Sequence, residues 1–361
     1  GIGFGAMAAI GSKAVSAIGS GLKSLTAGAI SAGANFENAM SSVAAISGAT
    51  GSDFDRLSEK AKQLGKSTQY TASETASAME YMAMAGWKTE DMLNGIEGVM
   101  DLAAASGEDL AGVSDIVTDA MTAFGLSADG TTKIIKDGFT KEVSNASHFA
   151  DVLAAASANS NTNVAMLGES FKYAAPVAGS LGYSVEDTAI ALGLMASSGL
   201  KSSMAGSSLR TILTNLAKPT DDISDAMDYL GISLQNGDGS MKSLMDIVTD
   251  LRGAFGQCKM PMDQFQENLA KLDEKYANGE LTEKKYNEAL ADLTEKAYGA
   301  EGALKAKYAA TLAGKEGMSG LLSIVSAAPE DFDKLTNAIY NSDGAAKEMA
   351  EIKMDNLQHD V

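Results

Sequence analysis

The sequence has few helix breakers and few of the residues that build metal sites. Its 361 residues include only 4 prolines, 1 cysteine (Cys258) and 2 histidines (His148 and His359). A lone cysteine excludes an intrachain disulfide framework and is typical of a reducing compartment. The two histidines lie far apart in the chain, and no group of Cys and His has metal-ligand spacing. We therefore predict no metal and no cofactor.

Aromatic residues are also scarce, at 6% of the chain, although 45% of the residues are hydrophobic. Alanine and the 19 methionines must then fill much of the core. Small side chains let helix backbones approach closely, and methionine adapts to irregular gaps. With so few prolines, this composition predicts an all-α fold built by packing helix on helix.

Basic residues are outnumbered, since the formal net charge is −19. Between Thr71 and Thr132, eleven carboxylates face one base, Lys88. Nucleic-acid binding requires Lys and Arg to replace phosphate counterions, so we predict no specific binding of DNA or RNA. The acidic stretch is interpreted as a solvated face, with a surface that repels DNA as the functional alternative.

Long apolar runs are missing as well. Residues 1–11 carry no charge, but Lys13 and Lys23 interrupt the stretch and no run of about 18 apolar residues follows. We predict neither a secretion signal nor a membrane-spanning helix. The first residue is not Met and the sequence stops abruptly at Val361, which indicates a segment of a longer chain.

What is present begins with a heptad-like pattern in a Gly- and Ala-rich stretch, residues 1–47. Apolar residues recur there in alternating steps of three and four, which matches a coiled-coil seam. We predict a self-associating helix over 1–47; the alternatives are a helix packed on its own domain and a membrane-seeking helix. The seam positions are Val15, Ile18, Leu22, Leu25, Ala29, Ala32, Phe36, Ala39, Val43 and Ile46.

Residues 48–257 read as a core of successive helices. Thr71 and Glu74 form a capping box, and Ser184 followed by Glu186 and Asp187 marks another helix start. We find no sustained run of alternating β-branched residues, so no strand is predicted.

The core also contains an approximate repeat. A glycine, an aromatic residue, two further residues and Glu-Asp occur in that order at 86–91 and again at 182–187, an offset of 96 residues. Duplication of a helix–turn–helix unit is one explanation. The other is that two helix starts share the same capping chemistry.

The composition becomes more charged after Pro261. Phe265, Leu269, Leu272 and Tyr276 form one apolar stripe, and Tyr286, Leu290, Leu293 and Ala297 form a second. The turn dipeptide Asn278-Gly279 separates them. We predict a charged helical hairpin over 258–312, inserted in the core, and further helices over 313–361 that lead into a longer chain.

No constellation of residues predicts catalysis. Carboxylates are abundant, but helical spacing places most of them on outward faces rather than in a desolvated cleft. Ser170 and Ser208 lack the second glycine of a nucleophile elbow. The stretch 235–239 hints at calcium but lacks the later bidentate Glu, so a plain turn is favoured. We predict no catalytic, cofactor-binding or metal-binding residues and no enzymatic activity.

Several segments, taken in order, resemble the core region of tape-measure proteins from tailed phages of Gram-positive bacteria. The likeness covers nearly all of residues 36–357, and 262–312 looks like an insertion seen in some members. The segments that carry it are Phe36–Met40, Val43–Gly51, Ala61–Gly65, Thr71–Gly86, Phe124–Leu126, Phe171–Ala178, Gly206–Arg210, Leu230–Gly239, Leu312–Gly317 and Asp355–Leu357.

The resemblance implies a virion structural protein around which tail-tube subunits polymerise and whose extended length sets tail length. It also implies contacts with itself and with tail-tube, distal tail and tail-tip hub proteins and tail assembly chaperones. The expected location of the protein is the tube lumen and tip, and the host cytoplasm during assembly. The protein would be released at infection during DNA ejection.

The turns in this sequence forbid a single extended helix, so these residues are expected to be a compact or end-anchoring core, with the ruler elsewhere in the chain. A membrane-active protein that aids DNA passage through the host envelope is the alternative. Cell-wall hydrolysis by an unrecognised carboxylate pair, and a phage-like bacteriocin or injection device, also stay open.

Overall fold

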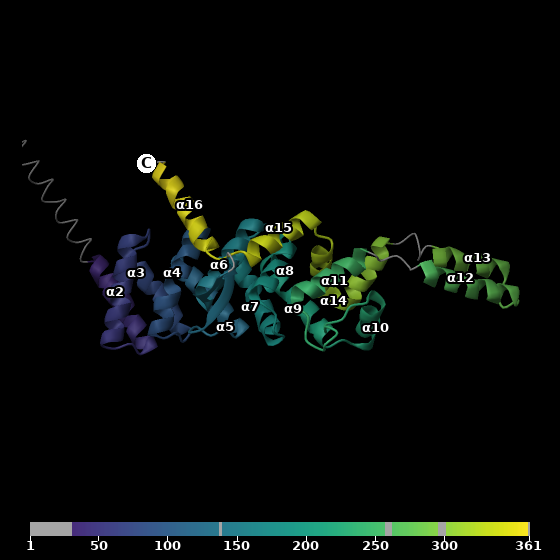
Figure 1. The fold of residues 1–361 in the computed structure, drawn as a ribbon, viewed down its shortest axis with the longest axis horizontal. Helices are drawn as coiled ribbons and strands as arrows, with labels where there is room; N and C mark the ends of the chain where they lie inside the picture. The colour runs from purple at the N-terminus through teal and green to yellow at the C-terminus, as the bar shows by residue number, and fades with distance from the viewer. Residues whose placement is uncertain (1–30, 137–138, 257–261, 295–300, 360–361) are drawn as a thin grey trace, which may run out of the picture.

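The protein forms an elongated body of packed helices, with a helical hairpin standing apart at one end (Figure 1). The structure is a computed structural model that describes residues 31–136, 139–256, 262–294 and 301–359. The prediction of an all-α fold is confirmed, with one small two-stranded sheet in addition.

Residues 31–47 are helical and lead into the numbered elements. The core consists of α2 (Ser52–Ser67), α3 (Ala72–Met84), α4 (Thr89–Ser106), α5 (Leu110–Phe124), β1 (Thr131–Lys136), β2 (Phe139–Ser144), α6 (Asn145–Asn159), α7 (Val164–Ser180), α8 (Val185–Ser197), α9 (Ser202–Ala217), α10 (Asp221–Leu230) and α11 (Leu244–Gly256). The remainder consists of α12 (Met262–Ala277), α13 (Glu283–Thr294), α14 (Glu301–Val325), α15 (Pro329–Tyr340) and α16 (Ala345–His359).

Local capping chemistry fixes where several helices begin. The Thr71 N–H donates to Glu74 Oε2 over 2.7 Å and the Glu74 N–H donates to Thr71 Oγ1 over 3.2 Å, so the predicted capping box opens α3. Ser184 Oγ accepts the Asp187 N–H at 3.0 Å and opens α8. Both predicted helix starts are confirmed.

Eight of the helices stack as four hairpins in two rows. α2, α4, α6 and α8 pack side by side in one row, and α3, α5, α7 and α9 pack side by side in the other. In the first row, Arg56 of α2 contacts Glu90 of α4 at 3.0 Å, and His148 of α6 contacts Glu186 of α8 at 2.9 Å. Stacking of this kind buries a continuous core between the rows, as in other proteins built from repeated helix pairs.

The two similar sequence segments have the same backbone geometry. Trp87 N–H donates to Met82 O and Tyr183 N–H donates to Ala178 O, each over 3.0 Å and 96 residues apart. The preceding glycines, Gly86 and Gly182, both have positive φ, 88° and 78°. This is the glycine-ended helix terminus in which backbone N–H groups satisfy the last free carbonyls. Duplication of the unit stays a prediction, as do the domain boundaries.

The prediction that the chain contains no strand was wrong for β1 and β2. β1 pairs with β2 in antiparallel register, with Thr131 opposite Ser144 and Ile134 opposite Lys141. Four of the six residues of β1 are β-branched, and Asp137-Gly138 is a strong hairpin dipeptide in the sequence. The signal was short and interrupted by lysines, so the search for a sustained run missed it.

The chain then turns back along the first row. α14 packs on α9 and closes that end of the stack, and α15 and α16 run back over α8, α6 and α4 (Figure 1). At the turn, Arg252 of α11 donates to the carbonyl oxygens of Ile324 at 2.7 Å and Ala327 at 2.8 Å. Its guanidinium also lies 4.4 Å from the ring centre of Phe332. One side chain thus joins α11, the end of α14 and α15.

Replacing Arg252 by methionine is expected to lower the free energy of unfolding by about 2 kcal/mol, because two carbonyl groups lose a charged donor and the Phe332 ring loses a cation. Chemical denaturation followed by circular dichroism measures the change. Arg210→Met is the matched control, since the exposed Arg210 only lies over the Tyr173 ring at 5.9 Å. Equal losses in the two variants would show that Arg252 does not brace the turn.

The predicted N-terminal seam is only partly described. Val15, Ile18, Leu22 and Leu25 lie outside the described residues. Phe36 is half-buried against the core, with the Lys62 ammonium 5.4 Å from its ring centre. Val43 is fully buried in the same core. These later seam positions pack on their own chain, and self-association through the earlier ones stays a prediction.

The hairpin of α12 and α13 packs on itself. Tyr276 and Tyr286 lie with ring centres 4.7 Å apart, and the Tyr286 hydroxyl donates to Asp273 Oδ1 over 2.6 Å. No described side chain of either helix is buried. The paired helices agree with the two predicted stripes, although Ala297 lies outside the described residues.

Candidate functional site

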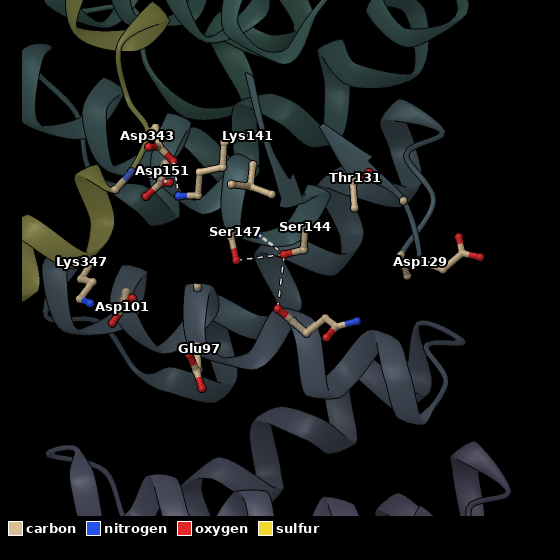
Figure 2. Close-up of a pocket in the computed structure, with 16 residues that line it drawn as sticks. Glu97, Asp101, Asp129, Thr131, Lys141, Ser144, Ser147, Asp151, Asp343 and Lys347 are labelled. Atoms are coloured by element: carbon tan, nitrogen blue, oxygen red, sulfur yellow. Dashed lines mark hydrogen bonds and ion pairs between the residues drawn. The ribbon is translucent and has the colours of Figure 1, made fainter. Parts of the chain in front are cut away.

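A cavity of about 570 Å³ lies where three parts of the chain that are distant in sequence meet. α4 forms one wall, β1 and β2 with the start of α6 form another, and the connection from α15 to α16 closes the third (Figure 2). Its lining is rich in charge and contains five carboxylates and two ammonium groups. These are Glu97, Asp101, Asp129, Asp151, Asp343, Lys141 and Lys347.

At one end of the cavity, Asp151 of α6 holds the start of α16. Its carboxylate accepts the Gly344 N–H at 2.9 Å and the Ala346 N–H at 3.0 Å. Nearby, Lys141 of β2 pairs with Asp343 at 3.4 Å, and Figure 2 shows these three charged side chains gathered together. Free N–H groups and the helix dipole both favour a carboxylate at a helix N-terminus. Asp151 therefore caps a helix that begins almost 200 residues later.

Asp101 and Lys347 face one another between α4 and α16 (Figure 2). Burial raises the pKa of Asp101 to about 6, even though the positive charge of Lys347 lowers it. The carboxylates of Glu97, Asp151 and Glu351 add to the rise. Burial also raises the pKa of Asp151, against the lowering effect of its two backbone hydrogen bonds. Two carboxylates thus carry an unfavourable charge beneath α16.

Hydroxyl and amide groups on the opposite wall hold the strands to the helices. Ser144 Oγ accepts the Ser147 N–H at 3.2 Å and donates to Asn94 O over 3.3 Å, joining β2, α6 and α4. Asn145 accepts the Thr132 hydroxyl at 2.8 Å and donates to Ser127 O over 2.9 Å. These polar groups are occupied in structural hydrogen bonds.

The cavity has no arrangement typical of catalysis. Its two serines bond to backbone and to each other, with no histidine in the lining, so no nucleophile and base are paired. Across the described ranges, no three His, Cys, Asp or Glu side chains come together in a way that could hold a metal ion. The chemistry available is electrostatic contact between helices.

Other residues singled out in the sequence have structural partners. Ser170 donates to Ser202 O over 2.8 Å, and Ser208 donates to Gly317 O over 3.3 Å, so each joins two helices. Residues 235–239 form a turn in which Asp238 accepts the Ser240 N–H at 2.9 Å, as predicted. Cys258 and residues 1–5 lie outside the described residues.

His148, one of the two histidines of the sequence, has an ionisable partner. It is buried on α6, and its Nε2 lies 2.9 Å from Glu186 Oε1. Burial raises the pKa of Glu186. The hydrogen bond and charge of His148, together with hydrogen bonds from Ser184 and the Glu186 backbone, outweigh this effect, so the pKa lies below its usual value. The contact ties α6 to α8.

The acidic cluster at Asp101 and Asp151 was not predicted from the sequence. Its signal is faint: Asp101 and Asp151 each interrupt an apolar, alanine-rich helix segment, where a charge is out of place on a core-facing side.

Comparison with known proteins shows to which family the chain belongs. The model of the phage-related minor tail protein family matches residues 58–273, more than half of the chain. The chain belongs to the phage-related minor tail protein family. The matched part runs from α2 through the stacked hairpins and into α12, so it includes most of the cavity lining.

Two curated relatives of this family member are tape measure proteins. The tape measure protein of Pneumococcus phage Dp-1 is 36% identical over 352 residues, which are 98% of this chain and 26% of that protein. The probable tape measure protein of Escherichia phage P2 is 24% identical over 305 residues, 84% of this chain and 31% of that protein. The chain therefore spans about a quarter to a third of these relatives. No solved structure matches it.

Proposed function

We propose that these residues are the folded core of a phage tail tape measure protein, with a structural rather than an enzymatic role. The observation that carries the proposal is the likeness to the Dp-1 tape measure protein along 98% of the chain. The tail is the proposed location. The proposed partners are tail-tube, distal tail and tail-tip hub proteins, tail assembly chaperones and further copies of this chain.

The fold supports an anchoring core rather than the ruler itself. A tape must be extended, and a helix gains about 1.5 Å of length per residue. Here α15 and α16 return over α8, α6 and α4, so these residues add little net length to the body. Measurement of tail length would then depend on the parts of the full protein that lie outside the stacked hairpins.

Deleting residues 262–294 in the phage is expected to leave tail length unchanged. The deletion removes 33 residues that form α12 and α13, which pack on one another rather than on the stack. If these residues were part of an extended helical ruler, the tail would shorten by about 50 Å. Electron micrographs of purified tails give the length distribution.

The matched control is a 33-residue in-frame deletion in the full-length protein beyond the residues aligned with this core, which should shorten the tail. Shortening by the hairpin deletion would contradict the anchoring role. If imaging of labelled, purified particles placed this segment outside the tail, the result would contradict the tail proposal as a whole.

The membrane-active alternative depends on residues 1–36, most of which lie outside the described residues. No helix in the described part of the chain combines the length and apolar character needed to cross a membrane. Liposome leakage by the intact chain that disappears when residues 1–36 are removed would revive this alternative.

A further inference from the structure

An exposed turn between α10 and α11 contains an asparagine followed by a glycine, Asn236-Gly237. The sequence has two more such pairs, Asn94-Gly95 and Asn278-Gly279. In this dipeptide the backbone nitrogen of the glycine can attack the asparagine side chain, because no Cβ atom hinders its approach. The attack requires a glycine N–H that makes no hydrogen bond and a backbone that is free to move. The structure separates the three pairs on these two conditions.

Gly237 meets both conditions. The carbonyl oxygen of Asn236 accepts the Gly239 N–H at 3.0 Å, and the Asn236 N–H donates to Ser240 O over 2.8 Å. The Gly237 N–H itself has no hydrogen-bond partner among the described residues. Asn236 and Gly237 are both exposed, and a Cβ atom at Gly237 would meet nothing within 4 Å. The Asn236 side chain donates to Ser240 Oγ over 3.0 Å, an exposed bond that water can replace.

The other two pairs do not meet these conditions. Gly279 is also exposed, but its N–H donates to Tyr276 O over 3.0 Å. Gly95 is buried inside α4, where each N–H donates to the carbonyl oxygen four residues earlier. A Cβ atom there would lie 2.6 Å from a ring carbon of Trp87, so the backbone is closely packed at this point. At either glycine, a backbone hydrogen bond must break before the nitrogen can attack.

We propose that Asn236 is a site of spontaneous deamidation, where this chain gains a negative charge faster than at its other two Asn-Gly pairs. The Gly237 nitrogen attacks Asn236 Cγ, so an N–Cγ bond forms and the Cγ–Nδ2 bond breaks. Ammonia leaves with the proton that the Gly237 nitrogen gives up. Water then opens the cyclic imide. Cleavage of the N–Cγ bond yields an aspartyl residue, and cleavage of the bond to the main-chain carbonyl yields an isoaspartyl residue.

The effect of the reaction is expected to be confined to the turn. The new carboxylate arises two residues from Asp238, and the isoaspartyl product adds a methylene group to the main chain at position 236. The hydrogen bonds to Gly239 and Ser240 depend on the ordinary spacing of the N–H and C=O groups at that position, so the longer main chain cannot keep both. Residues 235–240 are all exposed, and we therefore expect α10 and α11 to stay folded.

Peptide mapping by mass spectrometry tests the proposal on the 361-residue chain, incubated folded and, in parallel, unfolded in urea. In the folded chain, deamidation at Asn236 is expected to be at least about fivefold faster than at Asn278, because Gly279 must first lose a backbone hydrogen bond. Asn94 is expected to stay intact over the same period. In urea the three pairs should react at similar rates, since these hydrogen bonds are lost.

Gly237→Ala is the blocking variant. Gly237 does not have a positive φ, and the added methyl group enters open space, so the turn should tolerate alanine while the attack on Asn236 slows to the rate at Asn278 or below. Gly253→Ala is the matched control, because it also adds a methyl group in open space and should leave the rate at Asn236 unchanged. Four results would overturn the proposal: an intact Asn236, equal or faster deamidation at Asn278 or Asn94 in the folded chain, an unchanged rate in Gly237→Ala, or the same order of rates in urea.

Discussion

Replacing Phe171 by alanine is expected to lower the free energy of unfolding by about 4 kcal/mol, the range for a buried phenylalanine. Phe171 of α7 is fully buried. Its ring centre lies 5.7 Å from that of Phe124 in α5 and 5.4 Å from that of Phe149 in α6. Since aromatic residues are only 6% of the chain, this cluster is a large part of its aromatic core. It joins the two rows of helices, so its loss should weaken the whole stack.

Urea denaturation followed by far-ultraviolet circular dichroism measures this change. Met204→Ala is the control, because that side chain is 66% exposed on α9 and its truncation should cost less than about 0.5 kcal/mol. A cost below about 1 kcal/mol for Phe171→Ala would show that the three rings do not form a closely packed core. A second test is Phe171→Leu, which keeps most of the volume and should cost about half as much.

Helix positions were predictable because their signals are local. The hydroxyl of Thr71 and the carboxylate of Glu74 lie three residues apart, and the capping box that they form depends only on that spacing. Glycines such as Gly125 and Gly231 end helices in the left-handed conformation, which requires no distant partner. The paired stripes of α12 and α13 likewise follow from helical periodicity.

The small sheet was missed because the contacts that stabilise it are not local in sequence. A two-stranded hairpin is marginal by itself and needs support from the rest of the fold. β1 and β2 obtain that support where Ser144 and Asn145, at the junction with α6, bond to Asn94 O and Ser127 O. A pattern read along six residues carries no information about those contacts.

The candidate site was beyond prediction because its parts are far apart in sequence. Lys141 and Asp343 are separated by 202 residues, and the Asp151 carboxylate accepts an N–H 195 residues away. Helical periodicity indicates which face of α16 is apolar, but not which helices receive it. The return of α15 and α16 over the first row is a property of tertiary packing, and the raised pKa of Asp101 follows from that packing.

Replacing Gly206 by alanine is expected to destabilise the protein by about 2 kcal/mol, although alanine is the better helix former. Gly206 of α9 lies at the closest approach to α7. A Cβ atom there would overlap the carbonyl oxygen of Ser170 and lie 2.9 Å from its carbonyl carbon. Because the opposing group is backbone, it cannot turn away, and the two helices must separate. Thermal denaturation followed by circular dichroism would show a lower midpoint.

Gly253→Ala supplies a control of opposite sign. Gly253 also lies inside a helix, α11, but a Cβ atom there meets nothing within 4 Å. The same substitution should therefore stabilise by about 0.5 to 1 kcal/mol, since it only reduces the flexibility of the unfolded chain. If both alanines stabilise, α7 and α9 do not cross as closely as described. If both destabilise, the loss comes from a general sensitivity of helices to added side chains rather than from the crossing, and the close approach of α9 to Ser170 loses its support.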